Sequence, residues 1–221
     1  MKVNKMKKSF LFIGILFLIL LSAMKFENNI KGKVVCFGDS ITHGAKVDGH
    51  SWVYFLAKKH KDINFINAGR NGRKTSDKEE ILPVLKEIPD ADYFLLFLGV
   101  NDLKDGNDSL VNNCGENMQW MIQKIKLTNS KTKIVILSPS DINLKTMSAL
   151  NVKKKYNLNT KQSLRKLEKS YTELAKEESL GFISLLKTVS PPNYVDGLHP
   201  NVKGQQQIAN AVWRGMNKLF H

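Results

Sequence analysis

Short apolar runs alternate with longer amphipathic stretches along most of the chain. Five runs of four to six residues are rich in β-branched or aromatic side chains, which is typical of buried strands. The run at 93–98, Tyr-Phe-Leu-Leu-Phe-Leu, is the most apolar and predicts a strand at the centre of a sheet. The predicted strands cover residues 33–37, 63–66, 93–98, 133–137 and 181–186.

Helical periodicity occupies the segments between these strands. Apolar residues recur every three or four positions, and Asp77 and Asn201 are expected to cap the second and the last helix. Strands that alternate with helices predict a parallel sheet covered on both faces, and right-handed crossovers wind it into a three-layer α/β/α sandwich. The predicted helices cover residues 52–60, 77–88, 112–127, 161–178 and 201–219.

The longest segment without a clear period covers residues 138–160, directly after the fourth predicted strand. In open parallel sheets, ligands bind at the edge where the strands end. Loops of this length in compact domains are typically functional or mobile. We therefore expect this polar segment, with Asn143, Lys145, Asn151 and Asn157, at the rim of a binding site.

Residues 1–23 have the pattern of an export signal. Four lysines precede an apolar run from residue 10 to residue 24, which is short for a membrane span of about 20 residues but fits a signal peptide. The small residues Ser22 and Ala23 predict cleavage after Ala23, and the alternative is an uncleaved membrane anchor. In both cases we expect export, and if the signal is removed we expect no stable membrane anchor. A polar spacer at 24–32 and one domain at 33–221 follow the signal.

The composition is that of a globular domain with an excess of positive charge. Lys and Arg number 34 against 20 Asp and Glu, giving +14, and removal of the four lysines in residues 1–23 leaves 30 against 20, or +10. This charge would attract anionic polymers, although lysines spread along a chain are typical of a solvated surface. With only two cysteines, a disulfide-dense scaffold and a cysteine zinc site are excluded, and we expect Cys36 and Cys114 to be unpaired.

Two motifs at opposite ends of the domain carry candidate chemistry. The first predicted strand runs into Gly38-Asp39-Ser40, which exposes a serine hydroxyl at the carboxyl edge of the sheet. Asp196 lies three residues before His199, so its carboxylate can accept from one ring nitrogen while the other takes a proton from a serine. Each motif alone is also compatible with an ordinary turn or helix cap.

Two further strand ends carry hydrogen-bond donors. Asn101 follows the central strand within Gly-Val-Asn-Asp at 99–102, and Gly69 and Gly72 follow the second strand. Acyl transfer needs donors around the developing oxyanion, each worth roughly 3 kcal/mol. The Ser40 N–H, a glycine N–H and the Asn101 amide can supply them from three strand ends.

Together these motifs resemble those of the SGNH/GDSL hydrolases, and they occur in the order of that family. The resemblance extends from residue 34 to about residue 206, and it implies a flavodoxin-like three-layer sandwich. The four matching blocks are Gly-Asp-Ser at 38–40, Asn-Ala-Gly-Arg-Asn-Gly at 67–72, Gly-Val-Asn-Asp at 99–102 and Asp-Gly-Leu-His at 196–199.

The resemblance also implies roles for individual residues. Ser40 would be the nucleophile, His199 the general base and then acid, and Asp196 the group that orients the histidine. The oxyanion hole would combine the Ser40 N–H, the Asn101 side chain and a glycine N–H of the second block. The Asn-x-x-x-x-Gly spacing favours Gly72 as this glycine, and Gly69 is the alternative.

Other polar residues have no expected catalytic role. His43 lies three residues after Ser40, but the resemblance gives it no role, and we expect it at the surface or behind the residues that contact substrate. Asp39 and Asp102 are expected to fix the turns beside the active residues. The remaining histidines lack metal-ligand spacing, so neither a metal nor another cofactor is predicted.

The resemblance implies a serine esterase acting on a small-molecule or glycan ester. The export signal and the polar segment at 138–160 favour a short-chain acyl group, most simply acetyl, on a carbohydrate. The enzymatic alternative is a lysophospholipase or thioesterase, with Leu144, Met147 and Leu150 lining an acyl channel. A non-catalytic binder of anionic polymers is the alternative of another class, although no nucleic-acid-binding motif is present and nucleic acid is not expected as a partner. The sequence makes no prediction of an oligomeric state.

Overall fold

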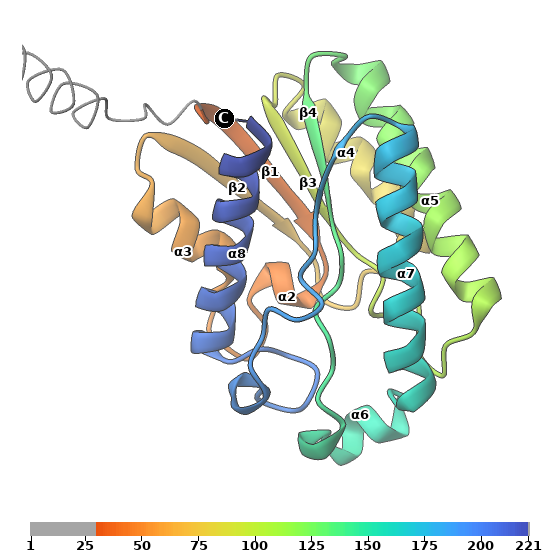
Figure 1. Ribbon diagram of the computed structural model, residues 1–221. Helices are drawn as coiled ribbons and strands as arrows, with labels where there is room; N and C mark the ends of the chain where they lie inside the picture. The colour runs from red at the N-terminus through yellow and green to blue at the C-terminus, as the bar shows by residue number, and fades with distance from the viewer. Residues whose placement is uncertain (1–29, 221) are drawn as a thin grey trace, which may run out of the picture.

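The computed structural model describes residues 30–220, which form a parallel sheet between two layers of helices (Figure 1). The strand order is β2-β1-β3-β4-β5, an order found in flavodoxin-like folds. Because β1 pairs with both β2 and β3, the order reverses at β1, and ligands bind in such folds beyond the strand ends at this point. The predicted fold class is therefore confirmed. The strands are β1 (Gly32–Gly38), β2 (Ile63–Gly69), β3 (Tyr93–Phe97), β4 (Lys133–Leu137) and β5 (Gly181–Ile183).

Each face of the sheet has its own hydrophobic core. Along β1, Val34 and Cys36 pack with the helices of one face, and Val35 and Phe37 pack with those of the other. The first face is covered by α2 (Ser40–His43), α3 (Trp52–Lys59) and α8 (Val202–Phe220). The second is covered by α4 (Ile81–Glu87), α5 (Asp108–Thr128) and α7 (Leu158–Glu177) (Figure 1).

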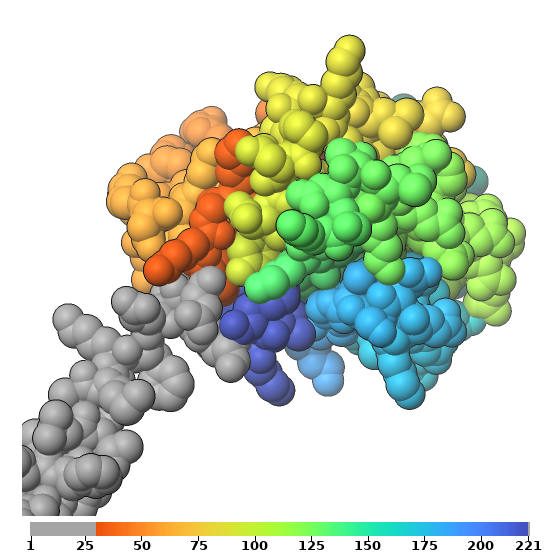
Figure 2. Space-filling view, turned by 90° about the horizontal axis from the view of Figure 1, so that it is seen from above, coloured from red at the N-terminus to blue at the C-terminus, as the bar shows by residue number. Residues whose placement is uncertain are grey.

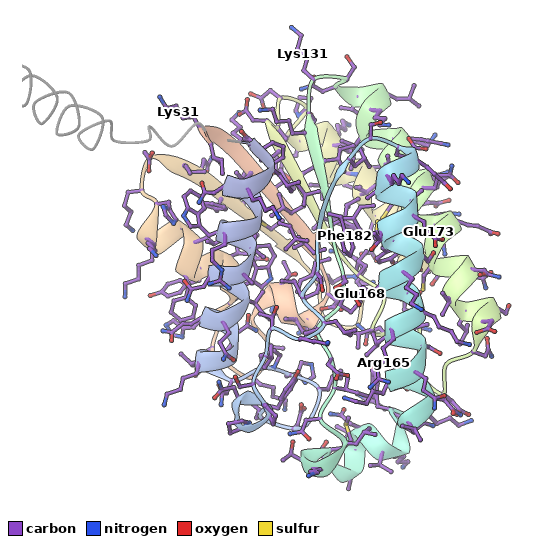
Figure 3. The ribbon with its side chains drawn as sticks, in the orientation of Figure 1. Lys31, Lys131, Arg165, Glu168, Glu173 and Phe182 are labelled. Atoms are coloured by element: carbon purple, nitrogen blue, oxygen red, sulfur yellow. The ribbon has the colours of Figure 1, made fainter. Side chains whose placement is uncertain are left out.

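The spacing of apolar residues in helix α7 determines which side of the helix packs against the sheet. Its charged side, which includes Arg165 and Glu173, faces solvent (Figure 3). The apolar positions predicted to face the core are all buried: Leu164, Leu167, Tyr171 and Leu174.

Several element boundaries differ from the prediction because of local capping. Helix α5 begins four residues earlier than predicted, since the side chain of Asn107 accepts from the Leu110 N–H at 3.0 Å. Asp77 does not cap α4. It lies inside the 3-10 helix η1 (Thr75–Glu80), where its carboxylate accepts from the Lys74 N–H at 3.0 Å. Strand β5 ends at Ile183, three residues earlier than predicted.

The aperiodic segment at 138–160 is ordered by short helices. It contains η2 (Leu144–Thr146), α6 (Ala149–Lys153) and the first residues of α7, while η3 (Pro191–Asn193) follows β5. Helices this short carry too few repeats to give a readable period. Helix α6 lies beyond the carboxyl ends of the strands, at the bottom of Figure 1.

The end of the sheet opposite to the site includes residues of the predicted spacer. Ile30 is fully buried in the core beneath α8, so the last residues of the predicted spacer belong to the domain. Figure 2 looks onto this end, with the last turn of α8 beside the start of β4; Lys133 Nζ lies 5.0 Å from the Phe220 ring centre. The predicted signal at 1–23 lies outside the described residues. Among the helices at 30–220, none is both long and apolar enough to cross a membrane.

Cys36 and Cys114 are both free and buried, as predicted. Cys36 belongs to the core on the α3 and α8 face, and Cys114 belongs to the core on the α5 and α7 face. The sheet between them prevents a disulfide.

Candidate active site

Ser40 is the first residue of α2, immediately after β1. Asp39 caps this short helix, and its carboxylate accepts from the Ile41 N–H at 2.9 Å, which confirms the expected turn-fixing role. At the other end, Gly44 has φ +91° and donates its N–H to the Ser40 carbonyl. The Ser40 N–H lies in the first turn, where N–H groups have no acceptor inside the helix and are available to an anion.

Ser40, His199 and Asp196 form a continuous hydrogen-bonded chain. Ser40 Oγ lies 3.0 Å from His199 Nε2. His199 Nδ1 lies 2.9 Å from Asp196 Oδ2 and 3.1 Å from Oδ1. The three residues predicted from two distant motifs therefore meet at the carboxyl edge of the sheet. In this arrangement the histidine can take a proton from the serine while the carboxylate holds the ring.

The local environment keeps Asp196 ionised. Burial alone would raise the pKa of Asp196, but hydrogen bonds from the His199 ring, from the His199 N–H at 2.8 Å and from the Leu198 N–H at 3.1 Å hold it well below its usual range. A charged carboxylate at this position stabilises the imidazolium that forms when His199 accepts a proton.

The segment at 138–160 supports the turn that carries this pair. Asn143 N–H donates to the Gly197 carbonyl at 2.7 Å, and Asn151 Nδ2 donates to the Asp196 carbonyl at 3.1 Å. Gly197 has φ +79°, and an added Cβ would lie 2.6 Å from the Asn143 carbonyl oxygen. Glycine is needed here both for the left-handed backbone and for the close approach of the two segments. The segment thus lies against the site, as predicted.

Asn101 is buried in the turn after β3, with its side-chain amide fixed from both sides. Nδ2 donates to the Arg73 carbonyl at 3.1 Å, and Oδ1 accepts from the Tyr156 hydroxyl at 2.7 Å. These bonds define which end of the amide is the donor, and the second hydrogen on Nδ2 remains available. Sequence reasoning missed Tyr156, because it lies in the segment without periodicity.

The two candidate glycines have different roles. The Gly69 N–H already donates to Asn67 Oδ1 at 2.9 Å, and an added Cβ would lie 2.3 Å from the His43 nitrogen. Gly69 therefore allows the end of β2 to pack against α2. Gly72 has φ +76°, and its N–H has no acceptor within residues 30–220. The Gly72 N–H is therefore available to a ligand, whereas the Gly69 N–H is occupied.

Arg73 is a second residue that the sequence did not reveal. Its side chain is 7% exposed. It donates to the Gly38 carbonyl at 2.7 Å and to the Ala68 carbonyl at 2.6 Å, and lies 4.0 Å from the Phe37 ring centre. Burial lowers the pKa of Arg73, and its hydrogen bond to Glu80 opposes this effect. The guanidinium ties the ends of β1 and β2 together beneath the site. A single arginine in a loop gives no sequence signal for this role.

The remaining polar residues behave as supports. The Asp102 carboxylate accepts from the Thr75 N–H at 3.0 Å and the Thr75 hydroxyl at 2.7 Å, which confirms its turn-fixing role. Burial raises the pKa of Asp39 to about 7, against the Ile41 N–H that lowers it. His43 is exposed, as predicted. In the described part of the chain, no group of three His, Cys, Asp or Glu side chains could hold a metal ion.

A family profile and several solved structures match this chain. The sequence profile of the GDSL-like Lipase/Acylhydrolase family matches residues 36–207. A lipase/acylhydrolase from Enterococcus faecalis is 23% identical, with a TM-score of 0.67 over 87% of this chain and 98% of its own. A carbohydrate acetylesterase family member from Sinorhizobium meliloti is 19% identical, with a TM-score of 0.72 over 86% and 99%. The aryl esterase of M. smegmatis is 19% identical, with a TM-score of 0.73 over 86% and 100%.

No curated protein matches the sequence, and the structural neighbours, at these identities, establish the fold. The family profile covers most of the chain and includes Ser40, Asn101, Asp196 and His199. The resemblance inferred from the four motifs is confirmed. The chain belongs to the GDSL-like lipase/acylhydrolase family, and it is an acylhydrolase with the SGNH hydrolase fold.

Proposed function

We propose that the protein is an exported serine esterase that removes short-chain acyl groups, most simply acetyl, from a carbohydrate. The observation that carries the proposal is the hydrogen-bonded chain from Ser40 Oγ through His199 to Asp196. This chain supports Ser40 as a nucleophile, because each group lies within hydrogen-bond distance of the next in the free protein.

In the first half of the reaction, Ser40 Oγ attacks the ester carbonyl while His199 Nε2 takes the hydroxyl proton. The carbonyl oxygen becomes an oxyanion and accepts from the N–H groups of Ser40 and Gly72 and from Asn101 Nδ2. When the C–O bond breaks, His199 returns the proton to the leaving alcohol. The acyl group is left on Ser40, and Asp196 holds the imidazole in one tautomer throughout.

In the second half, water attacks the acyl-serine. His199 takes a proton from the water and then returns it to Ser40 Oγ, so that one carboxylic acid is released and the enzyme is restored. All proton transfers use the same ring nitrogen. The proposed mechanism draws every group from side chains and backbone and assigns no step to a metal or other cofactor.

The carbohydrate part of the proposal has two supports. One structural neighbour is described as a carbohydrate acetylesterase family member. On the segment that packs against the Asp196 turn, the amides of Asn143 and Asn151 bond to the Pro191 and Asp196 carbonyls. The exposed polar residues Lys145 and Thr146 prevent this segment from forming a continuous apolar lid. Export through residues 1–23 would bring the enzyme to extracytoplasmic glycans.

A lysophospholipase or thioesterase is the second candidate. It is favoured by exposed apolar side chains on the same segment, since Leu144 is 37% and Leu150 59% exposed. Such side chains could contact a longer acyl chain. Family membership as an acylhydrolase argues against a purely non-catalytic binder of anionic polymers.

The test is an acyl chain-length series on p-nitrophenyl esters, run beside acetylated polysaccharides and a lysophospholipid, with released acid measured. We expect the highest kcat/KM for acetyl and release of acetate from at least one glycan, both lost in Ser40→Ala. A preference for acyl chains of eight or more carbons, without acetate release from any glycan, would replace the proposal with the second candidate.

A further inference from the structure

Four exposed lysines gather at the end of the sheet opposite to the catalytic edge, where β1 starts. Lys31 precedes β1 and Lys131 precedes β4, and Figure 3 shows both side chains at this end of the molecule. Lys133 begins β4, and its Nζ lies 5.0 Å from the ring centre of Phe220. Lys218 lies in the last turn of α8, which ends at Phe220. These four lysines therefore share one surface with the first residues of the domain.

Acids do not neutralise this surface. Among residues 30–220, the salt bridges at this end join Lys33 to Asp90 and Lys126 to Glu178, and none involves the four exposed lysines. The last turns of α3, α4 and α7 carry as many lysines as there are further acids at this end. These further acids are Asp62, Glu87, Asp92 and Glu177. The four lysines thus give this end a net positive charge.

A recess of about 400 Å³ lies on this surface, between the start of β4 and the turn that leads from α7 into β5. Three lysines line it against one acid, Glu178, and this acid bonds to Lys126 at 2.7 Å. Lys131 and Lys133 therefore line the recess as cations without a carboxylate partner, beside the exposed hydroxyl of Ser130. Ammonium and hydroxyl donors suit the phosphate of a lipid headgroup, which accepts hydrogen bonds and is negatively charged.

Two leucines are exposed at the same end. Leu127, in the last turn of α5, is 80% exposed, the highest value among the large apolar side chains of residues 30–220. Leu219, near the end of α8, is 40% exposed, and an added Cβ on Gly181 at the start of β5 would lie 2.8 Å from it. Exposed leucines beside lysines are typical of membrane-binding surfaces, because the leucines enter the headgroup layer and the lysines bind its anions.

The sequence before residue 30 places a membrane near this end. The apolar run that is predicted to enter the bilayer ends at residue 24, and the chain from there to Ile30 spans at most about 20 Å. Strand β1 then takes the chain about 20 Å further, to the catalytic edge at Ser40. During export, and afterwards if the signal is retained, this end therefore lies closer to the bilayer than the active site does.

We propose that this end of the domain binds an anionic lipid membrane. Phospholipid headgroups contact the exposed lysines and the recess beside β4, and the two exposed leucines enter the headgroup layer. The inference rests on the export in the proposed function and adds a partner to it. In this orientation the catalytic edge, at the bottom of Figure 1, faces away from the membrane and stays open to substrate. The contacting residues are Lys31, Lys131, Lys133, Lys218, Leu127 and Leu219.

Quenching of a dye at two positions tests the contact. A dye on Thr128→Cys reports this end, and a dye on Ala149→Cys reports α6 at the other end; both positions are exposed, whereas Cys36 and Cys114 are buried. The full chain is mixed with vesicles that carry a headgroup quencher, made of phosphatidylcholine alone or with an equal part of phosphatidylglycerol. We expect quenching at Thr128→Cys to be at least about fivefold stronger on the anionic vesicles and to weaken as salt rises, with no such difference at Ala149→Cys.

Matched charge variants identify the residues responsible. Replacing the four lysines of this end with glutamine should lower quenching at Thr128→Cys on anionic vesicles to its value on phosphatidylcholine, since each lysine near an anionic surface contributes about fivefold. Removing the same charge from the catalytic end should leave it unchanged. The first set is Lys31→Gln, Lys131→Gln, Lys133→Gln and Lys218→Gln, and the matched set is Lys46→Gln, Lys153→Gln, Lys154→Gln and Lys203→Gln.

The N-terminal residues are present in every sample, so their own membrane binding does not produce a difference between the two dye positions or between the two sets. Equal quenching at both positions, stronger quenching at Ala149→Cys, or no effect of the first set overturns the inference. Turnover of p-nitrophenyl acetate by the wild type and by the first set separates this result from the proposed function. Turnover without charge-dependent quenching overturns the membrane contact alone, and quenching as expected without turnover overturns the esterase alone.

Discussion

Replacing Tyr156 with phenylalanine removes one oxygen atom, the one that donates to Asn101 Oδ1 at 2.7 Å. The opposite end of the amide stays bonded to the Arg73 carbonyl at 3.1 Å. The variant therefore loosens the orientation of the proposed oxyanion donor without removing it. A role for Tyr156 through Asn101 predicts a loss of rate that is smaller than the loss caused by removing the amide.

The expected loss of kcat in Tyr156→Phe lies between two limits. Losing an oxyanion donor outright costs about 100- to 1000-fold in kcat, and a buried neutral hydrogen bond contributes about 0.5–1.5 kcal/mol. We expect kcat to fall about tenfold in Tyr156→Phe with KM nearly unchanged, because the amide acts mainly on the transition state. The free energy of unfolding should fall by about 1–2 kcal/mol.

The assay measures kcat and KM with p-nitrophenyl acetate together with urea denaturation. Tyr171→Phe is the matched control, since that buried hydroxyl donates to the Leu98 carbonyl at 3.3 Å and not to Asn101. It should lose similar stability and keep the wild-type kcat. Equal losses of kcat in both variants, or a loss that appears in KM alone, would refute the positioning role of Tyr156.

Three further outcomes are expected. Ser40→Ala should lower kcat by at least a thousandfold while the urea midpoint stays within error of the wild type, because only a hydroxyl is removed; a smaller loss would exclude Ser40 as the nucleophile. Asn101→Ala should lower kcat about 100- to 1000-fold with little change in KM, and a change in KM alone would assign Asn101 to ground-state binding. Arg73→Met should lower the free energy of unfolding by about 2–4 kcal/mol, measured by urea, because two strand-end carbonyls lose a charged donor; a loss under about 0.5 kcal/mol would contradict that role.

The sequence predicted the sheet and the proximity of Ser40, His199 and Asp196 because both leave local signals. The apolar runs of β1 and β3 are readable as strands, and each leads into a short polar motif, so their order along the chain also gives their common edge. Gly72 was likewise favoured by spacing alone. In such folds a short motif at a strand end defines its position in space.

The residues that hold the site in place, Tyr156 and Arg73, could not be predicted, because their roles depend on contacts between segments far apart in the sequence. Tyr156 meets Asn101 across 55 positions, and Arg73 meets Gly38 across 35. Neither side chain belongs to a period or a motif. The starts of two helices were predicted too late for a related reason. Asn107 and Asn157 cap α5 and α7 before the apolar stripe of each helix begins. A cap depends on one hydrogen bond and leaves no repeating pattern in the sequence.

Asp39 provides a prediction about stability against pH. The residue is 2% exposed, and burial raises its pKa from 3.8 to about 7. The Ile41 N–H and the charges of His199 and Arg73 oppose this effect, and the charge of Asp102 adds to it. Between these two values the folded state keeps a proton that the unfolded state has lost. The free energy of unfolding contributed by Asp39 therefore falls as pH rises from about 4 to about 7, and is constant above that.

Asp39→Asn isolates this contribution, since asparagine caps a helix about as well as aspartate and does not ionise. The stability of the variant relative to the wild type should grow between pH 4 and pH 7, by up to about 4 kcal/mol for a difference of about three pH units. Asp196 acts in the opposite sense and in another window, because its lowered pKa gives stability that is lost only below about pH 4. Urea denaturation at half-unit pH steps, with the exposed Asp62→Asn as control, separates the two. The prediction would be wrong if the stability of Asp39→Asn relative to the wild type stayed constant from pH 4 to pH 7. Asp39 would then be ionised in the folded protein throughout this range, as a carboxylate stabilised by Arg73 and the start of α2.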